Sequence, residues 1–287
     1  MLELQVGLNG LLLGGIYALM ALGMALVWGV MNIVNIAHGA YIVLGGYTAF
    51  WLFELYGIDP FLSLPLAMVG LFILGYLIQR YIINYIVRAE IFFTLLVTFG
   101  IDILIVNLAQ LAWKTDYRTV TPSYLTASLQ LGSVALPWAR LGAFVVALGI
   151  TALLFWLLRS TKLGRAIRAV SQDLDAARLS GVNLGRTYAV TYGLGAALAG
   201  GAGALLILIM AINPQIGGPL TLKSFVITVL GGLNTAWGPV VGGLTLGIVE
   251  EFSSLYIGDT LRNAISFGLL VLMLLLRPQG LLGRREV

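Results

Sequence analysis

Long apolar segments separated by short polar stretches make up almost all of this sequence. A segment of about 20 apolar residues is long enough to cross the hydrocarbon core of a bilayer as a helix. We predict such helices at residues 7–29, 33–53, 61–80, 91–112, 139–158, 187–212, 221–235, 238–257 and 262–277. The count falls from nine to eight if residues 221–257 form one re-entrant unit. The predicted fold class is an all-α polytopic membrane protein with about eight to nine transmembrane helices.

The composition indicates a membrane domain without an attached soluble domain. Of the 287 residues 60% are hydrophobic and only 10% are charged, whereas a soluble domain carries about 25% charged residues. The 36 glycines would weaken helices in water, but in lipid they let helices pack closely. There is no cysteine, which excludes disulfides and thiolate metal sites. We expect a single transmembrane domain over residues 1–287.

The basic residues indicate which loops face the cytoplasm. They gather in residues 159–186 and in the C-terminal tail, while Glu54 and Asp59 mark an acidic turn. The positive-inside rule places both basic regions in the cytoplasm and the acidic turn outside. The net charge of +4 therefore reflects membrane orientation and not binding to nucleic acid. Tracing the spans back from these regions gives an external N-terminus and an external loop at 113–138.

The sequence also contains an internal repeat. A gapless shift of 186 residues aligns 7–25 with 193–211 at ten identities in nineteen positions, and it aligns Val43–Gly46 with Val229–Gly232. Chance matching among common small residues is the alternative. Because five spans separate the two copies, we expect inverted halves at about 7–158 and 187–277, joined by a cytoplasmic segment at 159–186. Transporters built that way hold their solute near the bilayer midplane, between interrupted helices.

Residues 31–47 carry polar groups where the chain should be apolar. Asn32, Asn35 and the only histidine, His38, lie there among several glycines, and Asn35, His38 and Tyr41 recur at helical spacing. Such groups must be buried in protein or face water, so this segment predicts a path for a polar solute. We place residues of the second half opposite it, and the predicted pathway residues are Asn32, Asn35, His38, Gly39, Tyr41, Gly45, Gly46, Thr228, Gly231, Gly232 and Asn234. The alternative is that His38 only bonds a nearby carbonyl and that the glycines only permit close packing.

The cytoplasmic segment 163–186 reads LGRAIRAVSQDLDAARLSGVNLGR. Ser171 is a plausible N-cap, Asp173 would lie in the first turn, and Gly181 would end a short helix. A short amphipathic helix between two spans, in a chain without an energy-converting domain, predicts a docking surface for a separate motor protein. A solvated loop that only obeys the positive-inside rule is the alternative.

Asp102 lies near the middle of the span 91–112, where an unpaired carboxylate costs several kcal/mol. A stand-alone, ion-coupled secondary transporter would use such a residue, and contact with a partner subunit would explain it equally well. Glu250 and Glu251 lie closer to a span end, where we expect a smaller cost. Catalysis has little support, because the sequence lacks the Walker A, HExxH and GxSxG patterns and one histidine cannot build a multi-histidine metal site. We predict no catalytic residues, no metal site and no cofactor bound by this chain.

Four stretches carry a family resemblance that covers nearly the whole chain. NIVNIAHGAYIVLGGY, at 32–47, resembles the second-span signature of permease subunits of ABC importers for branched-chain amino acids, in particular the H-type subunit. GRAIRAVSQDLDAARLSGVN, GGLNTAWGPVVGG and RPQGLLG resemble that family's ATPase-contacting loop, late glycine-rich element and C-terminal tail. Asp102 departs from the family pattern, in which we expect a small polar residue.

The resemblance implies a function and a set of partners. The family's permeases pair with a second, similar M-type subunit, bind two cytoplasmic ATPases that hold ATP and Mg²⁺, and receive solute from a periplasmic binding protein. It implies a multi-pass protein of the bacterial inner membrane that moves branched-chain or other hydrophobic amino acids. A permease for urea or short-chain amides in the same family is the closer alternative. By resemblance, the residues that couple to the ATPase are Gly164, Arg165, Arg168, Asp173, Ala176 and Gly181.

Overall fold

The computed structural model describes residues 2–87, 90–132, 134–233, 235–258 and 261–283, and nearly all of its regular structure is helical. The helices of the first half, including a short 3₁₀ turn, are α1 (Leu2–Met31), α2 (His38–Tyr56), α3 (Pro60–Tyr81), η1 (Ile83–Tyr85) and α4 (Ile91–Trp113). The remaining helices are η2 (Ser123–Leu125), α5 (Trp138–Ser160), α6 (Lys162–Gln172), α7 (Leu174–Leu179), α8 (Leu184–Leu206), η3 (Pro214–Ile216), α9 (Gly217–Gly231), α10 (Gly238–Tyr256) and α11 (Arg262–Leu276).

Each of the nine predicted segments overlaps one of these helices. Helix α1 begins five residues earlier than predicted. Two predicted helical stretches are missing, since α2 begins five residues later than predicted and α8 ends six residues earlier. At both places a stretch of irregular backbone takes the place of the predicted helix. Within the described residues, five helical segments are long and apolar enough to cross a membrane: Leu2–Met31, Pro60–Tyr85, Ile91–Trp113, Trp138–Ser160 and Leu184–Leu206. The total of eight or nine crossings stays a prediction.

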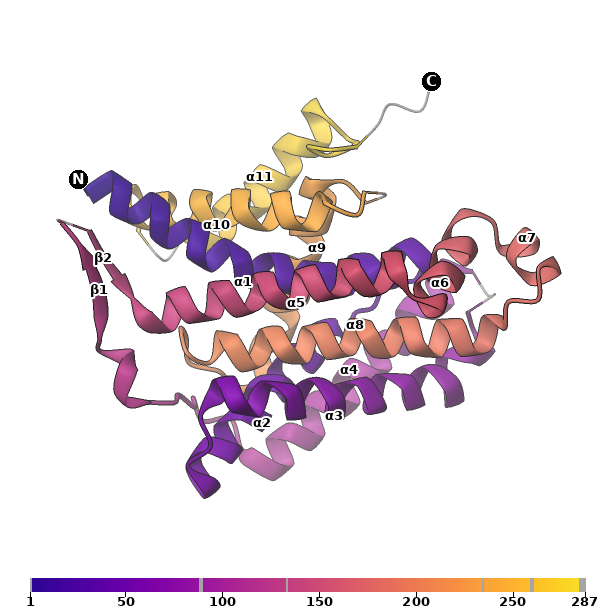
Figure 1. Ribbon diagram of the computed structural model, residues 1–287, viewed down its shortest axis with the longest axis horizontal. Coiled ribbons are helices and arrows are strands. Elements are labelled where there is room, and N and C mark those ends of the chain that lie inside the picture. Colours follow the sequence, from indigo (N-terminus) through magenta and orange to yellow (C-terminus); the bar gives the residue numbers. More distant parts are fainter. Residues whose placement is uncertain (1, 88–89, 133, 234, 259–260, 284–287) are drawn as a thin grey trace.

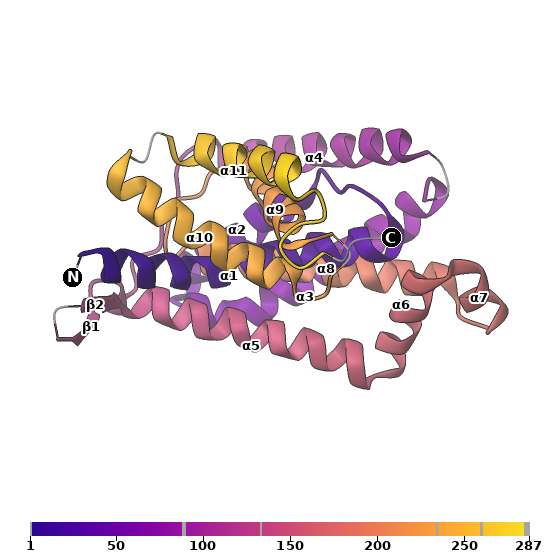
Figure 2. The same cartoon turned by 90° about the horizontal axis from the view of Figure 1, so that it is seen from above.

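The long helices lie side by side along the long axis of the molecule (Figure 1). Helices α6 and α7 project from one end, and the N-terminus lies at the opposite end, which agrees with the predicted cytoplasmic and external sides (Figure 1). Helix α9 is the exception, because it crosses the bundle at a steep angle to the others (Figure 2).

The turn between α2 and α3 shows how local sequence sets these ends. Gly57 has a left-handed φ of 65° and ends α2, a conformation that favours glycine. Two residues later the Asp59 carboxylate accepts a hydrogen bond of 2.8 Å from the Phe61 amide, and Pro60 occupies the first helical position of α3. The predicted acidic turn is therefore a helix stop followed directly by a helix start.

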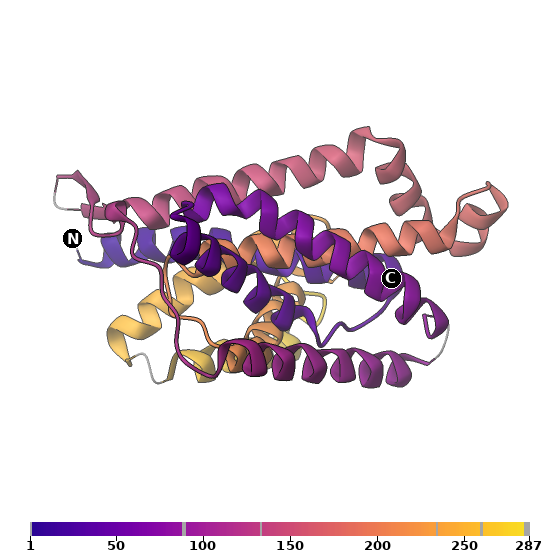
Figure 3. The same ribbon diagram turned by 90° about the horizontal axis from the view of Figure 1, so that it is seen from below.

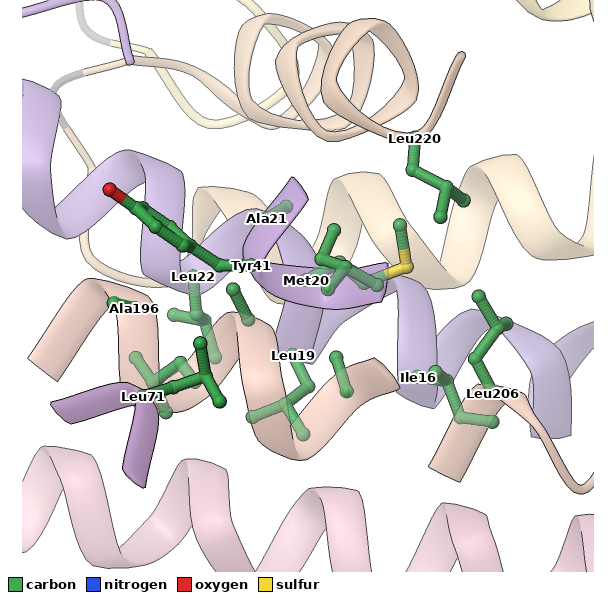
Figure 4. Close-up of a cluster of buried hydrophobic side chains, with 14 of the residues drawn as sticks. Ile16, Leu19, Met20, Ala21, Leu22, Tyr41, Leu71, Ala196, Leu206 and Leu220 are labelled. Carbon is green, nitrogen blue, oxygen red and sulfur yellow. The ribbon is translucent and has the colours of Figure 1, made fainter. Parts of the chain in front are cut away.

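Helix α1 forms the centre of the core. Its side chains Ile16, Leu19 and Met20 are fully buried, and they pack among residues of α2, α3, α8 and α9 (Figure 4). Glycine makes the closest helix contacts, since a Cβ on Gly14 of α1 would lie 2.7 Å from the Leu244 Cα of α10. The predicted role of glycine in close packing is confirmed at this contact.

The two halves have the same order of elements, α1 to α4 and α8 to α11, and α1 and α8 run in opposite directions (Figure 1). Opposite insertion of the two copies is therefore supported. The gapless offset is wrong, however, because a shift of 186 residues carries His38, the first residue of α2, to Ser224 in the middle of α9. The matched VLGG stretches lie inside α2 and at the end of α9. Insertions and deletions between the copies explain why no single offset aligns them. The exact halves stay a prediction.

The external loop after α4 contains a hairpin that the all-α prediction lacks. Strand β1 (Ser128–Leu131) pairs antiparallel with β2 (Val134–Pro137), at the end of the molecule that carries the N-terminus (Figure 3). Earlier in this loop, Arg118 and Ile212 exchange two backbone hydrogen bonds of 2.8 and 2.9 Å. The Arg118 guanidinium also lies 5.6 Å from the ring centroid of Phe50 on α2. The external loop is thus bonded to the segment that leads into α9.

Candidate functional site

The candidate site is the place where two irregular segments meet in the middle of the bundle. Residues 32–37 leave α1 without helical structure, and residues 207–216 lead from α8 into α9. Asn32 begins the first break with a φ of 52°, in the left-handed region that asparagine tolerates better than most residues. Both α2 and α9 therefore begin inside the protein, as the interrupted-helix prediction requires.

The starts of α2 and α9 are in direct contact through Gly39 and Thr221. The Thr221 hydroxyl accepts a hydrogen bond of 2.8 Å from the Gly39 amide and donates one of 2.9 Å to the Ile36 carbonyl. A Cβ on Gly39 would lie 2.6 Å from the Gly217 carbonyl carbon and 2.5 Å from the Thr221 hydroxyl. Only glycine fits at position 39 without moving α9.

Sequence reasoning placed Thr228 opposite the break, and the structure corrects this. Thr228 lies about two turns past Thr221 along α9, where its hydroxyl bonds the Ser224 carbonyl at 2.8 Å and lies 3.4 Å from the Ala21 carbonyl of α1. Thr221 is the residue that meets the first break. Asn234, the other residue that we placed there, lies outside the described residues.

The polar side chains of residues 32–41 are mostly buried in protein and do not share one helical face. Asn35 precedes α2, so the expected helical spacing from Asn35 to His38 and Tyr41 is wrong. A residue from the other half joins them, because the Tyr192 hydroxyl of α8 donates to the Asn35 side chain at 3.0 Å and lies 3.1 Å from the Tyr41 hydroxyl. The three side chains form one buried chain of hydrogen bonds.

His38 is fully buried at the first position of α2. Its Nε2 lies 2.9 Å from the Met20 carbonyl of α1, which is the bond that the packing alternative expected. Its Nδ1 has no hydrogen-bond partner among the described residues. His38 therefore fixes the break against α1 through one nitrogen, and the other nitrogen is left without a protein partner.

Thr98 of α4 supports the break from a third side. Its hydroxyl accepts from the Ile36 amide at 3.3 Å and lies 3.1 Å from the Val34 carbonyl. The sequence prediction missed this residue, although a threonine in an apolar span opposite an irregular backbone was the available signal. Side-chain hydroxyls from α4 and α9 thus satisfy the backbone groups that the missing helix leaves unpaired.

The remaining glycines of the predicted pathway serve the packing of these segments. Gly45 lies against the backbone of Gly200 on α8, and a Cβ on Gly46 would lie 2.8 Å from Ile212. Gly231 lies against Gly238, and Gly232 ends α9 with a φ of 109°. The amides of Leu281 and Leu282 then bond the last carbonyls of α9, those of Leu230 and Gly231, at 2.8 and 3.2 Å. The C-terminal tail therefore caps α9.

A buried charge cluster holds the other face of α9, and sequence reasoning missed it. Glu250 of α10 is fully buried, whereas we expected it to lie near a span end at small cost. Its carboxylate lies 2.9 Å from the Lys223 ammonium of α9 and 2.9 Å from the Arg262 guanidinium of α11. It also accepts from the Tyr17 and Ser266 hydroxyls at 2.7 and 2.6 Å. A lysine in an apolar segment was the signal for this cluster.

The cluster extends to a second carboxylate, Glu251, which pairs with Arg140 of α5 at 3.0 Å and with Arg262 at 3.7 Å. Asp102 does not join it. That residue is half-buried on α4, and its Oδ1 has no hydrogen-bond partner among the described residues. Asp102 thus lacks the basic partner that a structural ion pair would need.

The cytoplasmic segment forms two helices, and its caps differ from the prediction. Thr161 caps α6 by accepting from the Gly164 amide at 2.9 Å, and Asp173 caps α7 by accepting from the amides of Asp175 and Ala176. Ser171 lies inside α6, so its predicted capping role is wrong. Asp173 takes that role because its side chain precedes the first turn of the second helix. Gly181 follows α7 with a φ of 81°, close to its expected role as a helix stop.

A cavity of about 750 Å³ connects this cytoplasmic segment to the break. Arg168 of the predicted coupling segment and Asn32 of the predicted pathway both line it. In the part of the chain that the structure describes, no three His, Asp or Glu side chains lie close enough to hold a metal ion. The cavity thus lies between residues of the predicted coupling segment and residues of the predicted pathway.

Comparison with known proteins assigns the family. A family model described as "Branched-chain amino acid transport system / permease component" matches residues 7–274. The chain belongs to this family. The permease is 34% identical to the high-affinity branched-chain amino acid transport system permease protein BraD of Pseudomonas aeruginosa, over 99% of this chain and 97% of the relative. It is 33% identical to LivH of Escherichia coli K12, over 99% and 96%.

The permease is also similar to a second kind of subunit. It is 26% identical to LivM of Escherichia coli K12, over 93% of this chain and 68% of the relative. No solved structure matches. The family assignment agrees with the resemblance that the four sequence stretches carry.

Proposed function

We propose that this chain is the H-type permease subunit of an ABC importer and that it moves branched-chain or other hydrophobic amino acids across the bacterial inner membrane. The observation that carries the proposal is the similarity, over almost the whole length, to BraD and LivH, whose names state branched-chain amino acid transport. The two half-helices that begin inside the bundle support it, because interrupted helices in facing positions are typical of transporter solute sites.

The proposed pathway passes the contact between Gly39 and Thr221. In this conformation Asn35, His38 and Tyr41 are buried, so the break is closed. Transport then requires α9 to move relative to α2, which opens the break to one side of the membrane at a time. The other proposed pathway residues, from Gly45 to Gly232, shape the path by allowing this close packing. The chain contributes no covalent chemistry.

Energy comes from partner subunits in this proposal. Two cytoplasmic ATPases hold ATP and Mg²⁺ and dock on α6 and α7, through the surface around the proposed coupling residues Gly164, Arg165, Arg168, Asp173, Ala176 and Gly181. The exposed position of Arg165 and Asp173, at the end of the molecule where α6 and α7 project, supports that role (Figure 1). A second, M-type permease completes the membrane part, which the similarity to LivM supports. A periplasmic binding protein delivers the solute.

The test is uptake by the complete complex in proteoliposomes. Purified permease pair, ATPases and binding protein are expected to take up leucine only with ATP, and collapse of the ion gradient is expected to leave the rate unchanged. Uptake of urea in preference to leucine would support the urea permease instead. Uptake by the single subunit that stops when the gradient is dissipated would support an ion-coupled transporter that uses Asp102, and would refute the proposal.

A further inference from the structure

The cavity of about 750 Å³ reaches from the cytoplasmic end of the bundle toward the break, and we call it the inner vestibule. It is lined by α1, α5 and α6, by the first residue of the break, and by the turn between α9 and α10 with the start of α10. Its described lining residues are Leu22, Ala25, Leu26, Gly29, Val30, Asn32, Leu154, Phe155, Leu158, Ile167, Arg168, Ser171, Gln172, Leu233, Thr235, Ala236 and Pro239. Its volume falls within the range of about 300–1,000 Å³ that is common for small-molecule sites.

One face of α1 forms the long wall of the inner vestibule. The wall is a single helical stripe, because its residues recur at positions i, i+3, i+4, i+7 and i+8: Leu22, Ala25, Leu26, Gly29 and Val30. A Cβ on Gly29 would meet no atom within 4 Å, so the space beside Gly29 is open. This wall is entirely apolar.

The inner end of the wall lies at the level of the break. Leu22 is within two residues of Met20, whose carbonyl bonds His38, and it follows Ala21, whose carbonyl lies 3.4 Å from the Thr228 hydroxyl. The inner vestibule thus extends along α1 from the cytoplasmic end to the residues that hold α2 and α9 in place. A solute that leaves the break toward the cytoplasm would enter this space first.

The polar groups of the inner vestibule gather at its cytoplasmic end. Arg168, Ser171 and Gln172 lie on one face of α6, and Asn32 and Thr235 come from the two irregular segments. The Arg168 guanidinium forms no ion pair or hydrogen bond with any described residue, in contrast to Arg140 and Arg262. A cation without a protein counterion, beside an apolar wall, is suited to a ligand with a carboxylate and an apolar side chain.

We propose that the inner vestibule is the cytoplasmic release site for the transported solute, the apolar amino acid of the proposed function. The side chain lies against the α1 stripe and Phe155, and the Arg168 guanidinium receives the carboxylate. This inference rests on the proposed function and adds the place where the solute is held before it leaves. Urea has no apolar part, and an apolar wall would offer it no hydrogen-bond partners in place of water.

Because the sequence has no cysteine, single cysteines can be labelled without background. We would place Gly29→Cys in the complete complex, in inside-out vesicles without ATP, and measure its reaction with a membrane-impermeant methanethiosulfonate. Gly149→Cys is the matched control, since Gly149 is exposed on α5 with no atom within 4 Å of its Cβ but does not line the inner vestibule. We expect fast labelling at position 29, slow labelling at 149, and protection of position 29 by leucine but not by urea.

Three results would overturn the proposal. These are equal labelling at positions 29 and 149, no effect of leucine, or labelling at 29 that begins only after detergent removes the lipid, which would identify a lipid as the occupant. ATP-driven leucine uptake by the wild-type complex is measured alongside. If the wild-type complex takes up leucine but the labelling gives any of these three results, the release site is refuted and the proposed function still holds.

The carboxylate assignment has its own test in the Gly29→Cys background. Removing the charge-assisted contact with Arg168→Gln is expected to raise the leucine concentration for half-protection by about tenfold or more, and Arg168→Lys is expected to raise it less. Leucinol, which has a hydroxyl in place of the carboxylate, is expected to protect poorly. Arg168 also belongs to the proposed ATPase-docking surface, and a change in docking would shift protection by leucine and by leucinol alike, so a shift for leucine alone identifies the carboxylate contact. Unchanged protection by leucine in Arg168→Gln would refute the role of Arg168.

Discussion

The contact between Gly39 and α9 yields the sharpest prediction, for the substitution Gly39→Ala. The added Cβ would lie 2.5 Å from the Thr221 hydroxyl and 2.6 Å from the Gly217 carbonyl carbon, whereas ordinary contacts begin at 3.4 Å. The Gly217 carbonyl oxygen would be closer still to this Cβ, so the starts of α2 and α9 must separate by more than the 0.9 Å (3.4 − 2.5) that relief of the Thr221 contact alone requires. The hydrogen bond from the Gly39 amide to Thr221, now 2.8 Å, would then be longer than hydrogen bonds allow.

Both effects destabilise the folded permease. Overpacking costs about 1–3 kcal/mol, and a buried amide without a partner costs about 1–3 kcal/mol, so we expect a loss of about 2–6 kcal/mol. The assay is the melting midpoint of the purified complex in detergent, followed by size-exclusion fluorescence, with ATP-driven uptake as the second measurement. Gly70→Ala is the control, because a Cβ on Gly70 meets no atom within 4 Å. A Gly39→Ala protein that melts with the control and transports normally would refute the close contact of α2 and α9.

Three further substitutions test other contacts. Thr221→Val keeps the shape of the side chain but removes the hydroxyl that bonds the Gly39 amide and the Ile36 carbonyl. The free energy of unfolding should fall by about 1–3 kcal/mol, seen as a lower melting midpoint, and Thr221→Ser should restore it. Glu250→Gln leaves Lys223 without its buried counterion and leaves Arg262 with only the 3.7 Å contact to Glu251. We expect a cost of about 3–5 kcal/mol, seen as loss of folded complex on size exclusion, and combining it with Lys223→Met should recover part of this. Asp173→Ala removes the cap of α7, at a cost of about 1 kcal/mol, and should weaken leucine-stimulated ATP hydrolysis, whereas Asp173→Asn should keep it. Equal behaviour of the paired variants would refute each assignment.

The sequence predicted the helices well because their signal is local. Length and apolar character alone place α3, α4, α5 and α10 within two residues of their observed ends. The start of α2 was missed although Asn32 and Asn35 mark the segment before it, because polar residues alone do not say where a helix begins. The end of α8 was missed because residues 207–212 are as apolar as a helix interior. The close contact of Gly39 with Gly217, where α2 and α9 begin, joins two distant segments and is not visible in either stretch alone.

The candidate site was only partly predictable for the same reason. Asn35, His38 and Tyr41 stand out because polar groups are rare in an apolar run. Their partners Tyr192, Thr98 and Thr221 do not stand out, because tyrosine and threonine are ordinary residues in such spans. Lys223 and Glu250 were each visible as charges, but 27 residues separate them in the chain, and only the crossing of α9 against α10 brings them together.

The backbone pairing of Arg118 with Ile212 has a mechanical consequence. Only five residues separate Ile212 from Gly217, the first residue of α9, which is in contact with Gly39. A displacement of the external loop at Arg118 is therefore transmitted through residues 212–217 to the contact between the starts of α2 and α9. A protein that binds the outer face and displaces Arg118 would thereby move the starts of α2 and α9, without touching any residue inside the bundle.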